Sequence, residues 1–214
     1  MKRRDAVTGA EPHPKMRPSA DGGRSCPWVA LAFAVAYLIA YALASYLDLH
    51  TTLLALRRAG VREGNLYSVT ASGYASARAW VITAVGGLVL EGFVVFSLLN
   101  ASSVSERWLH RPIRSFGRFY IVPWSKGVID RSPLHALSFA IAFVALRLLA
   151  AGNNMLIHFR GVAPLGGLVE AVSARTGQAV GFWLVLGVLF CVLGVACSPL
   201  AARCLAWFRR WPPG

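Results

Sequence analysis

The chain has 214 residues, of which 56% are hydrophobic and only 14% are charged. Soluble domains carry about 25% charged residues. This composition excludes a disordered chain, a secreted disulfide scaffold and an ordinary cytosolic enzyme domain, and it predicts a polytopic membrane protein. The net charge of +13 would suggest nucleic acid on a soluble protein. Here it fits cytoplasmic loops that face anionic lipid headgroups, so no nucleic-acid partner is expected.

The chain divides into a basic tail and an apolar body. Residues 1–26 are rich in Pro, Gly and Arg and are predicted to be a mobile basic cytoplasmic tail. Residues 27–214 are predicted to form a single domain of four transmembrane helices. The expected fold is therefore all-α.

Four apolar runs are long enough to cross a bilayer, which takes about 20 helical residues. The first runs from Trp28 to Leu47, just before Asp48, and could continue toward Gly60, where a helix would end. Its Ala42-Leu43-Ala44 resembles a signal-peptide cleavage site, but the long leading segment and the continuing apolar run favour a retained helix. The other three runs cover 80–99, 134–157 and 180–200.

The distribution of positive charge predicts the orientation of the chain. Four spans put both termini on the same side as the loop 100–133. Most of the Lys and Arg residues lie on that side. The positive-inside rule therefore predicts cytoplasmic termini in a bacterial inner membrane.

Small residues in the spans predict packing surfaces, because helices in lipid associate through close backbone approach. These surfaces could meet either sister helices or another protein. The positions are Ala32, Ala36, Ala40, Ala44, Gly86, Gly87, Gly92, Gly187 and Gly194.

The loop 100–133 mixes cations with aromatic residues, which is typical of a segment that lies in lipid headgroups. Pro112 and Gly117 are expected to break it, so one continuous helix is not predicted. The alternative is a solvated loop.

Two ionisable residues interrupt the spans and are expected to face a partner or a cavity. Counting depth at about 1.5 Å per residue places Glu91 and Arg147 about 6 Å apart along the membrane normal. An ion pair between Glu91 and Arg147 is therefore predicted inside the bundle. Asp48, near the periplasmic edge, is a possible second partner of Arg147.

A polar cluster is predicted around Asp48 on the periplasmic side. Its role is either structural or that of a small cavity for a proton, an ion or a headgroup. Its expected members are His50, Thr51, Glu63, Asn65, Asn153, Asn154 and His158.

Catalytic and cofactor motifs are missing from the sequence. There is no GxSxG, Walker loop or HExxH motif, and the four cysteines form no CxxC pair. The cysteines are expected to be apolar core thiols. His50 and His158 lie at matched depth, but their spacing fits no ligand motif. No catalytic residue, metal site or cofactor is predicted, and haem or a metal is kept as an open alternative.

The stretch from Asp48 to Asn65 resembles a signature of small uncharacterised bacterial polytopic membrane proteins. In that group, Asp-x-x-Thr is followed by Gly and then by Glu-x-Asn-Pro. Asp48, Thr51, Gly60, Glu63 and Asn65 match the signature, but Leu66 replaces the Pro. The resemblance implies no activity, and links these residues as one set.

Three functions remain from the sequence. The first is a non-enzymatic membrane subunit or assembly factor that packs against a larger inner-membrane complex. The second is a small oligomeric proton- or ion-coupled transporter that uses Asp48, Glu91 and Arg147. The third is a haem-binding or catalytic membrane protein. The expected partners are membrane lipids and either another membrane protein or further copies of the chain.

Overall fold

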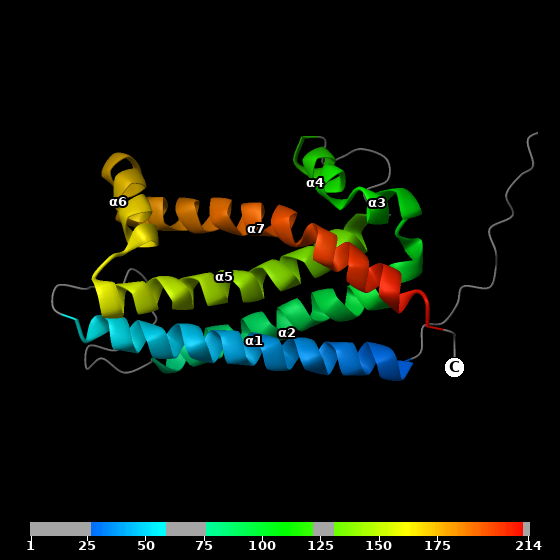
Figure 1. The fold of residues 1–214 in the computed structure, drawn as a ribbon, viewed down its shortest axis with the longest axis horizontal. Coiled ribbons are helices and arrows are strands. Elements are labelled where there is room, and N and C mark those ends of the chain that lie inside the picture. The colour runs from blue at the N-terminus through cyan, green and yellow to red at the C-terminus, as the bar shows by residue number, and fades with distance from the viewer. Residues whose placement is uncertain (1–26, 59–75, 122–130, 212–214) are drawn as a thin grey trace, which may run out of the picture.

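The computed structural model describes residues 27–58, 76–121 and 131–211, with side chains from 27–58, 76–116 and 131–211. The part of the chain so described is helical and contains no strand (Figure 1). Four helices are long and apolar enough to span a membrane. They are α1 (Pro27–Leu56), α2 (Ala77–Leu99), α5 (Ser132–Arg160) and α7 (Gln178–Phe208). The predicted class, an all-α polytopic membrane protein, is therefore confirmed.

The four long helices alternate in direction (Figure 1). We call the end where α1 and α5 begin, and α2 and α7 end, the proximal end. The opposite end is the distal end. Each helix is longer than its predicted apolar run: α2 begins three residues before Trp80, and α5 and α7 extend past both ends of their runs.

Helix α5 is the central element of the bundle and packs against α1, α2 and α7. In its most apolar stretch 44% of residues are buried, against 28% in α1 and α2 and 17% in α7. Leu134, Leu137 and Ala140 on α5 are fully buried. The outer faces of α1, α2 and α7 expose large apolar side chains, as expected of helices that face lipid acyl chains.

Two glycines allow the long helices to approach closely. A Cβ at Gly87 of α2 would lie 2.7 Å from Cε1 of Tyr41, and one at Gly194 of α7 would lie 2.9 Å from Cε1 of Phe139. The packing role predicted for these glycines is confirmed. At Gly92 and Gly187 a Cβ would meet nothing within 4 Å among the described residues, so neither packs against a sister helix.

The alanine ridge of α1 does not pack inside the bundle as one surface. Ala32, Ala36 and Ala40 are exposed, and only Ala44 is buried. The buried face of α1 carries larger residues, with the Tyr37 hydroxyl donating to the Ala140 carbonyl at 3.0 Å and the Tyr41 hydroxyl donating to the Thr83 carbonyl at 2.7 Å. Because these tyrosines join α1 to α5 and α2, the alanines are left on the outer face.

The loop 100–133 begins with three short elements at the proximal end, η1 (Ala101–Ser103), α3 (Glu106–His110) and α4 (Pro112–Ile121). A break before Pro112 is confirmed. The break expected at Gly117 is wrong, since that residue lies inside α4. Trp108 and Phe116 are buried in the protein.

Arg209, just after α7, holds this region in place. Its Nε donates to the Ala101 carbonyl at 2.7 Å, and its Nη2 donates to the Ser102 carbonyl at 3.0 Å and to the Val104 carbonyl. Its Nη1 pairs with Glu106 at 2.8 Å. These bonds tie the end of α7 to the backbone carbonyls of η1 and of the residue that follows it.

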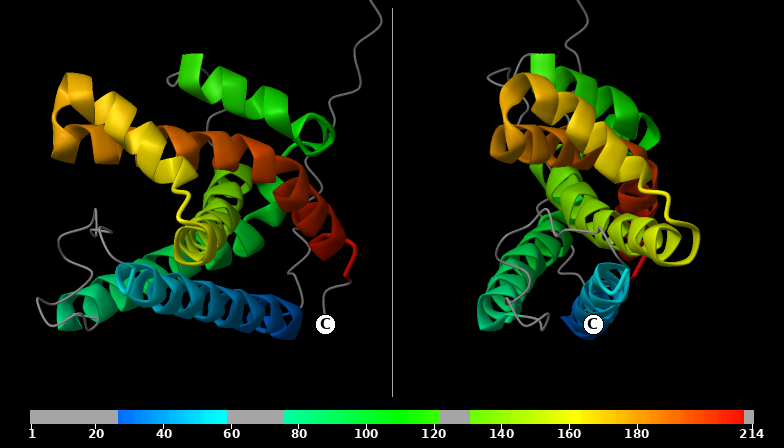
Figure 2. Two further views of the ribbon diagram at one scale, coloured as in Figure 1. Left: turned by 60° about the vertical axis from the view of Figure 1, so that its left-hand side comes forward. Right: turned by 90° about the vertical axis from the view of Figure 1, so that its left-hand side faces the viewer.

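A helix that the sequence analysis did not predict, α6 (Pro164–Thr176), folds back along the start of α7 (Figure 2). The turn between them is Gly177, at a φ of 86° that favours glycine. Gly181 on α7 allows close approach, because a Cβ there would lie 2.7 Å from the Cα of Ser173. At this end α7 begins at Gln178, two residues before the apolar run that marked the fourth span.

Candidate functional site

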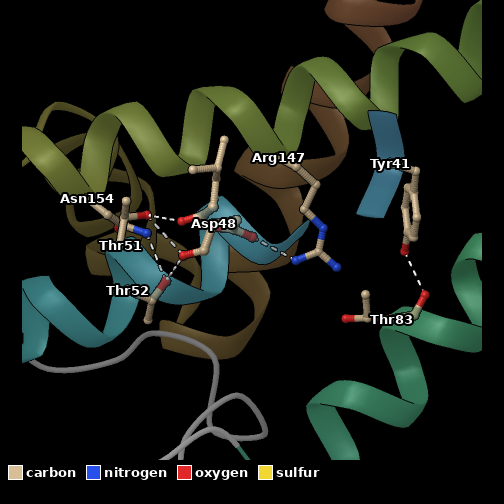
Figure 3. Close-up of polar contacts among 8 residues, drawn as sticks. Tyr41, Asp48, Thr51, Thr52, Thr83, Arg147 and Asn154 are labelled. Carbon is tan, nitrogen blue, oxygen red and sulfur yellow. Dashed lines mark hydrogen bonds and ion pairs between the residues drawn. The ribbon is translucent and has the colours of Figure 1, made fainter. Parts of the chain in front are cut away.

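An ion pair joins α1 to α5 inside the span region (Figure 3). Arg147 Nη1 donates to Asp48 Oδ2 at 2.7 Å, and the side chains are 26% and 14% exposed, respectively. The guanidinium also lies over the Phe143 ring, 5.5 Å from its centroid, which is favourable for a cation. The prediction that Asp48 could be a partner of Arg147 is confirmed.

The predicted ion pair between Glu91 and Arg147 is wrong. Arg147 is engaged by Asp48, and Glu91 forms no ion pair within the described residues. The Oε2 atom of Glu91 is buried there without a hydrogen-bond partner.

The stagger of the helices explains this error. Tyr41 contacts Thr83 and Gly87 of the antiparallel α2, so Glu91, one turn further along α2, falls near the level of Tyr37. Arg147 lies at the level of Asp48, which is 11 residues beyond Tyr37, or about 16 Å along the helix. Counting depth from the first apolar residue of each span placed the two charges only about 6 Å apart in depth, because it ignored the offset between the helices.

Three hydrogen-bonding side chains extend the site from Asp48 toward the distal end (Figure 3). Thr51 Oγ1 donates to the carbonyls of Leu47 and Asp48 at 2.8 and 3.0 Å. Thr52 Oγ1 donates to the Asp48 carbonyl at 2.8 Å, and Asn154 Nδ2 of α5 donates to Thr52 Oγ1 at 2.8 Å. The threonines therefore bond to their own helix, and Asn154 links that helix to α5.

The same two helices are joined once more at the distal end. His158 Nδ1 donates to the Leu54 carbonyl at 3.0 Å, which places its proton on Nδ1. Arg58 Nη1 donates in return to the His158 carbonyl at 3.0 Å. The sequence analysis missed Arg58. It lies against Gly161, whose φ of 69° ends α5, and no motif marks that contact.

The other predicted members of the cluster lie elsewhere. Asn153 Oδ1 accepts from the backbone N–H of Leu165 at 3.1 Å and so caps the start of α6. His50 is exposed, and its ring stacks on Tyr46 with the centroids 5.8 Å apart. Glu63 and Asn65 lie outside the described residues, as does Gly60. The predicted cluster thus divides into a joined set around Asp48 and separate structural contacts.

A second polar group, which the sequence analysis did not identify, is buried at the proximal end. Ser115 Oγ and His135 Nε2 are 2.9 Å apart, and the Phe116 ring packs against the His135 ring at a tilt of 46°, with the centroids 4.2 Å apart. Arg131, only 1% exposed, lies over the Trp108 ring at 5.2 Å. Residues 106–116 and the start of α5 come together only in the fold, so sequence spacing gave no signal.

Two apolar hollows on the surface lie apart from the ion pair. One, of about 440 Å³, is lined by Ala77, Arg78, Val81 and Ile82. The other, of about 400 Å³, lies between the start of α1 and the end of α7 and is lined by Trp28, Val29, Ala32, Phe33, Trp207 and Trp211. Neither includes a residue of the cluster around Asp48.

Neither the metal-binding side chains nor comparisons with known proteins assign a function. Within the described ranges, no three His, Cys, Asp or Glu residues gather as a metal site would require. Cys191, Cys197 and Cys204 are free and partly buried. No protein-family model, curated protein or solved structure matches the chain. Among the described residues, the span region holds the Asp48–Arg147 ion pair, the hydrogen bonds of Thr51, Thr52 and Asn154 beside it, and Glu91 apart from both.

Proposed function

We propose that the protein is a non-enzymatic subunit or assembly factor of the bacterial inner membrane, packing against a larger membrane complex. The observation that carries this proposal is the outward position of Ala32, Ala36 and Ala40 on α1. In lipid, burial of apolar side chains does not by itself drive helices together. A row of small side chains does favour association, because it lets the backbone of another helix come close. The occupant that fits is a transmembrane helix of the partner with its own small-residue face.

The polar contacts support the same function. Asp48 with Arg147 and Thr52 with Asn154 fasten α1 to α5, so these groups serve the fold. Fixing α1 in this way holds its alanine face in one orientation. A rigid face loses less entropy when a partner docks.

Charge and aromatic residues suggest how the subunit sits in the membrane. The proximal end carries the basic segments, which the positive-inside rule assigns to the cytoplasm. There they would contact anionic headgroups. Trp28 and Trp207 are exposed at the same end, where tryptophan anchors a helix at the lipid–water boundary.

The experiment compares two leucine substitutions on α1. Ala36→Leu adds bulk to the alanine face, whereas Ala42→Leu adds it to another exposed face of the same helix. Each variant would be purified in mild detergent and its stoichiometric partner quantified. We expect Ala36→Leu to lose the partner and Ala42→Leu to keep it. Equal retention by both variants would refute the alanine face as the contact, and a partner identified as a second copy would make the assembly a homo-oligomer.

A small oligomeric proton- or ion-coupled transporter is a second candidate, and the buried Oε2 of Glu91 favours it. An acid without a donor in the apolar layer is costly, and such acids often carry protons. Proton flux into liposomes should then vanish in Glu91→Gln. A variant that keeps both its fold and full flux would reject this candidate.

A further inference from the structure

The hollow between α1 and α7 lies at the proximal end, where α1 begins and α7 ends (Figure 1). Its volume of about 400 Å³ falls within the range of about 300–1,000 Å³ that is usual for small-molecule sites. Trp28 and Trp207 line it and are exposed. Because tryptophan side chains of membrane proteins gather at the lipid–water boundary, the hollow opens at the level of the headgroups and the upper acyl chains.

The lining of this hollow offers apolar and aromatic surface. On α1, Val29 and Phe33 pack against the buried core and, with the small side chain of Ala32, form one side of the hollow. On α7 and just after it, the rings of Trp207 and Trp211 meet edge to face, with their centroids 5.4 Å apart, and form the other side. No charged side chain lines the hollow. Its complement is therefore an apolar chain.

Two exposed arginines neighbour the lining residues of α7. Arg210 directly precedes Trp211, and its backbone N–H donates to the Trp207 carbonyl at 3.0 Å. Arg203 lies one turn before Trp207 on the same face of α7. Neither arginine makes an ion pair within the described residues. A long arginine side chain can extend its charge toward the boundary, so both can serve one anion at the headgroup level.

We propose that this hollow binds one anionic phospholipid of the leaflet at the proximal end. An acyl chain lies against Val29, Ala32 and Phe33, and the phosphate accepts hydrogen bonds from Arg203 and Arg210. An arginine can donate two parallel N–H bonds to one phosphate. A free phosphate would leave the apolar lining unused. A zwitterionic lipid would bring its own cation beside the arginines, so the net negative headgroup is required.

This lipid site goes beyond the proposed function, because it is complete in the isolated chain. It shares Ala32 with the alanine face, whereas Ala36 and Ala40 do not line the hollow. Ala36→Leu, which should cost the partner, should therefore leave lipid binding unchanged. The failure of either proposal can then be told apart from the failure of the other.

The test compares two lipids and two pairs of substitutions by native mass spectrometry in mild detergent. The probes are phosphatidylglycerol and phosphatidylcholine with the same acyl chains. Arg203→Gln with Arg210→Gln removes two charges at the proximal end. Arg160→Gln with Arg175→Gln removes two exposed charges at the distal end and is the matched control.

We expect the unmodified chain to bind one phosphatidylglycerol at least about tenfold more tightly than phosphatidylcholine, as two arginines near an anionic lipid would produce. The proximal variant should bind both lipids equally, and the distal variant should behave like the unmodified chain. Equal binding of the two lipids by the unmodified chain, or the same loss in both variants, would overturn the proposal.

A second measurement locates the acyl chain. Phosphatidylglycerol with brominated acyl chains quenches the fluorescence of the tryptophans that it touches. Ala32→Leu fills part of the hollow, whereas Ala42→Leu adds the same bulk on another exposed face of α1. We expect Ala32→Leu to raise the lipid concentration needed for half-maximal quenching and Ala42→Leu to leave it unchanged. An unchanged concentration in Ala32→Leu would show that the chain lies elsewhere and would refute the site.

Discussion

The ion pair between Asp48 and Arg147 makes the sharpest prediction about stability. Arg147→Leu would leave the Asp48 carboxylate without its cation inside the span region. Arg147→Leu combined with Asp48→Leu removes both charges. Arg147→Leu combined with Glu91→Leu removes an acid that the structure places about 16 Å from Arg147 along the bundle.

The magnitude follows from burial. Removing one member of a buried pair costs about 3–5 kcal/mol, and a charge at the centre of a transmembrane helix costs about 2.5–3.5 kcal/mol. Since the two side chains are 26% and 14% exposed, the low end applies. We expect Arg147→Leu to lose about 3 kcal/mol, or about two powers of ten in the ratio of folded to unfolded protein. The double variant with Asp48→Leu should recover most of this loss.

The assay is unfolding in mild detergent with added denaturing detergent, followed by tryptophan fluorescence and size-exclusion chromatography. The four chains of the Asp48–Arg147 cycle give the coupling energy between the two residues. The variant with Glu91→Leu is the control and should show no recovery. Recovery in that control, or equal loss in the single variant and the Asp48 double variant, would refute the pairing.

Two further predictions concern backbone contacts. Gly87→Ala should destabilise the protein by about 1–3 kcal/mol through overpacking against Tyr41. Gly92→Ala, whose Cβ meets open space, should stabilise its helix by about 0.5–1 kcal/mol. The same unfolding assay checks both variants, and an undiminished stability of Gly87→Ala would contradict the close approach of α1 and α2. Arg209→Lys keeps the charge but cannot reach the carbonyls of 101–104 together, so limited proteolysis should cut 100–111 faster. Unchanged cleavage would show that Arg209 does not hold this segment.

The positions of the four spans could be predicted from the sequence because length and hydropathy set them. A bilayer requires about 20 apolar residues in a helix whose backbone is satisfied internally. The short helices were harder. The break at Pro112 was readable from proline chemistry, but α6 was not, because its packing depends on Gly181 and Gly177 of a neighbouring element.

The faces of the spans could not be predicted in the same way. In a soluble helix, polar residues mark the outside, but here lipid and protein interior are both apolar. The pattern Ala32, Ala36, Ala40 therefore predicted a packing surface without saying whether a sister helix or another protein occupies it. The tertiary structure turned it outward, because Tyr37 and Tyr41 occupy the contacts with α5 and α2.

The sequence alone determined that this chain is all-α and crosses a membrane four times, and it marked Asp48, Glu91 and Arg147 as the costly charges. Only the tertiary structure decided that Asp48 holds Arg147 and that Glu91 stands apart. The reason is that hydropathy is a local sum over neighbouring residues, whereas the pairing of charges depends on the stagger between helices. That stagger is set by packing between residues far apart in the chain.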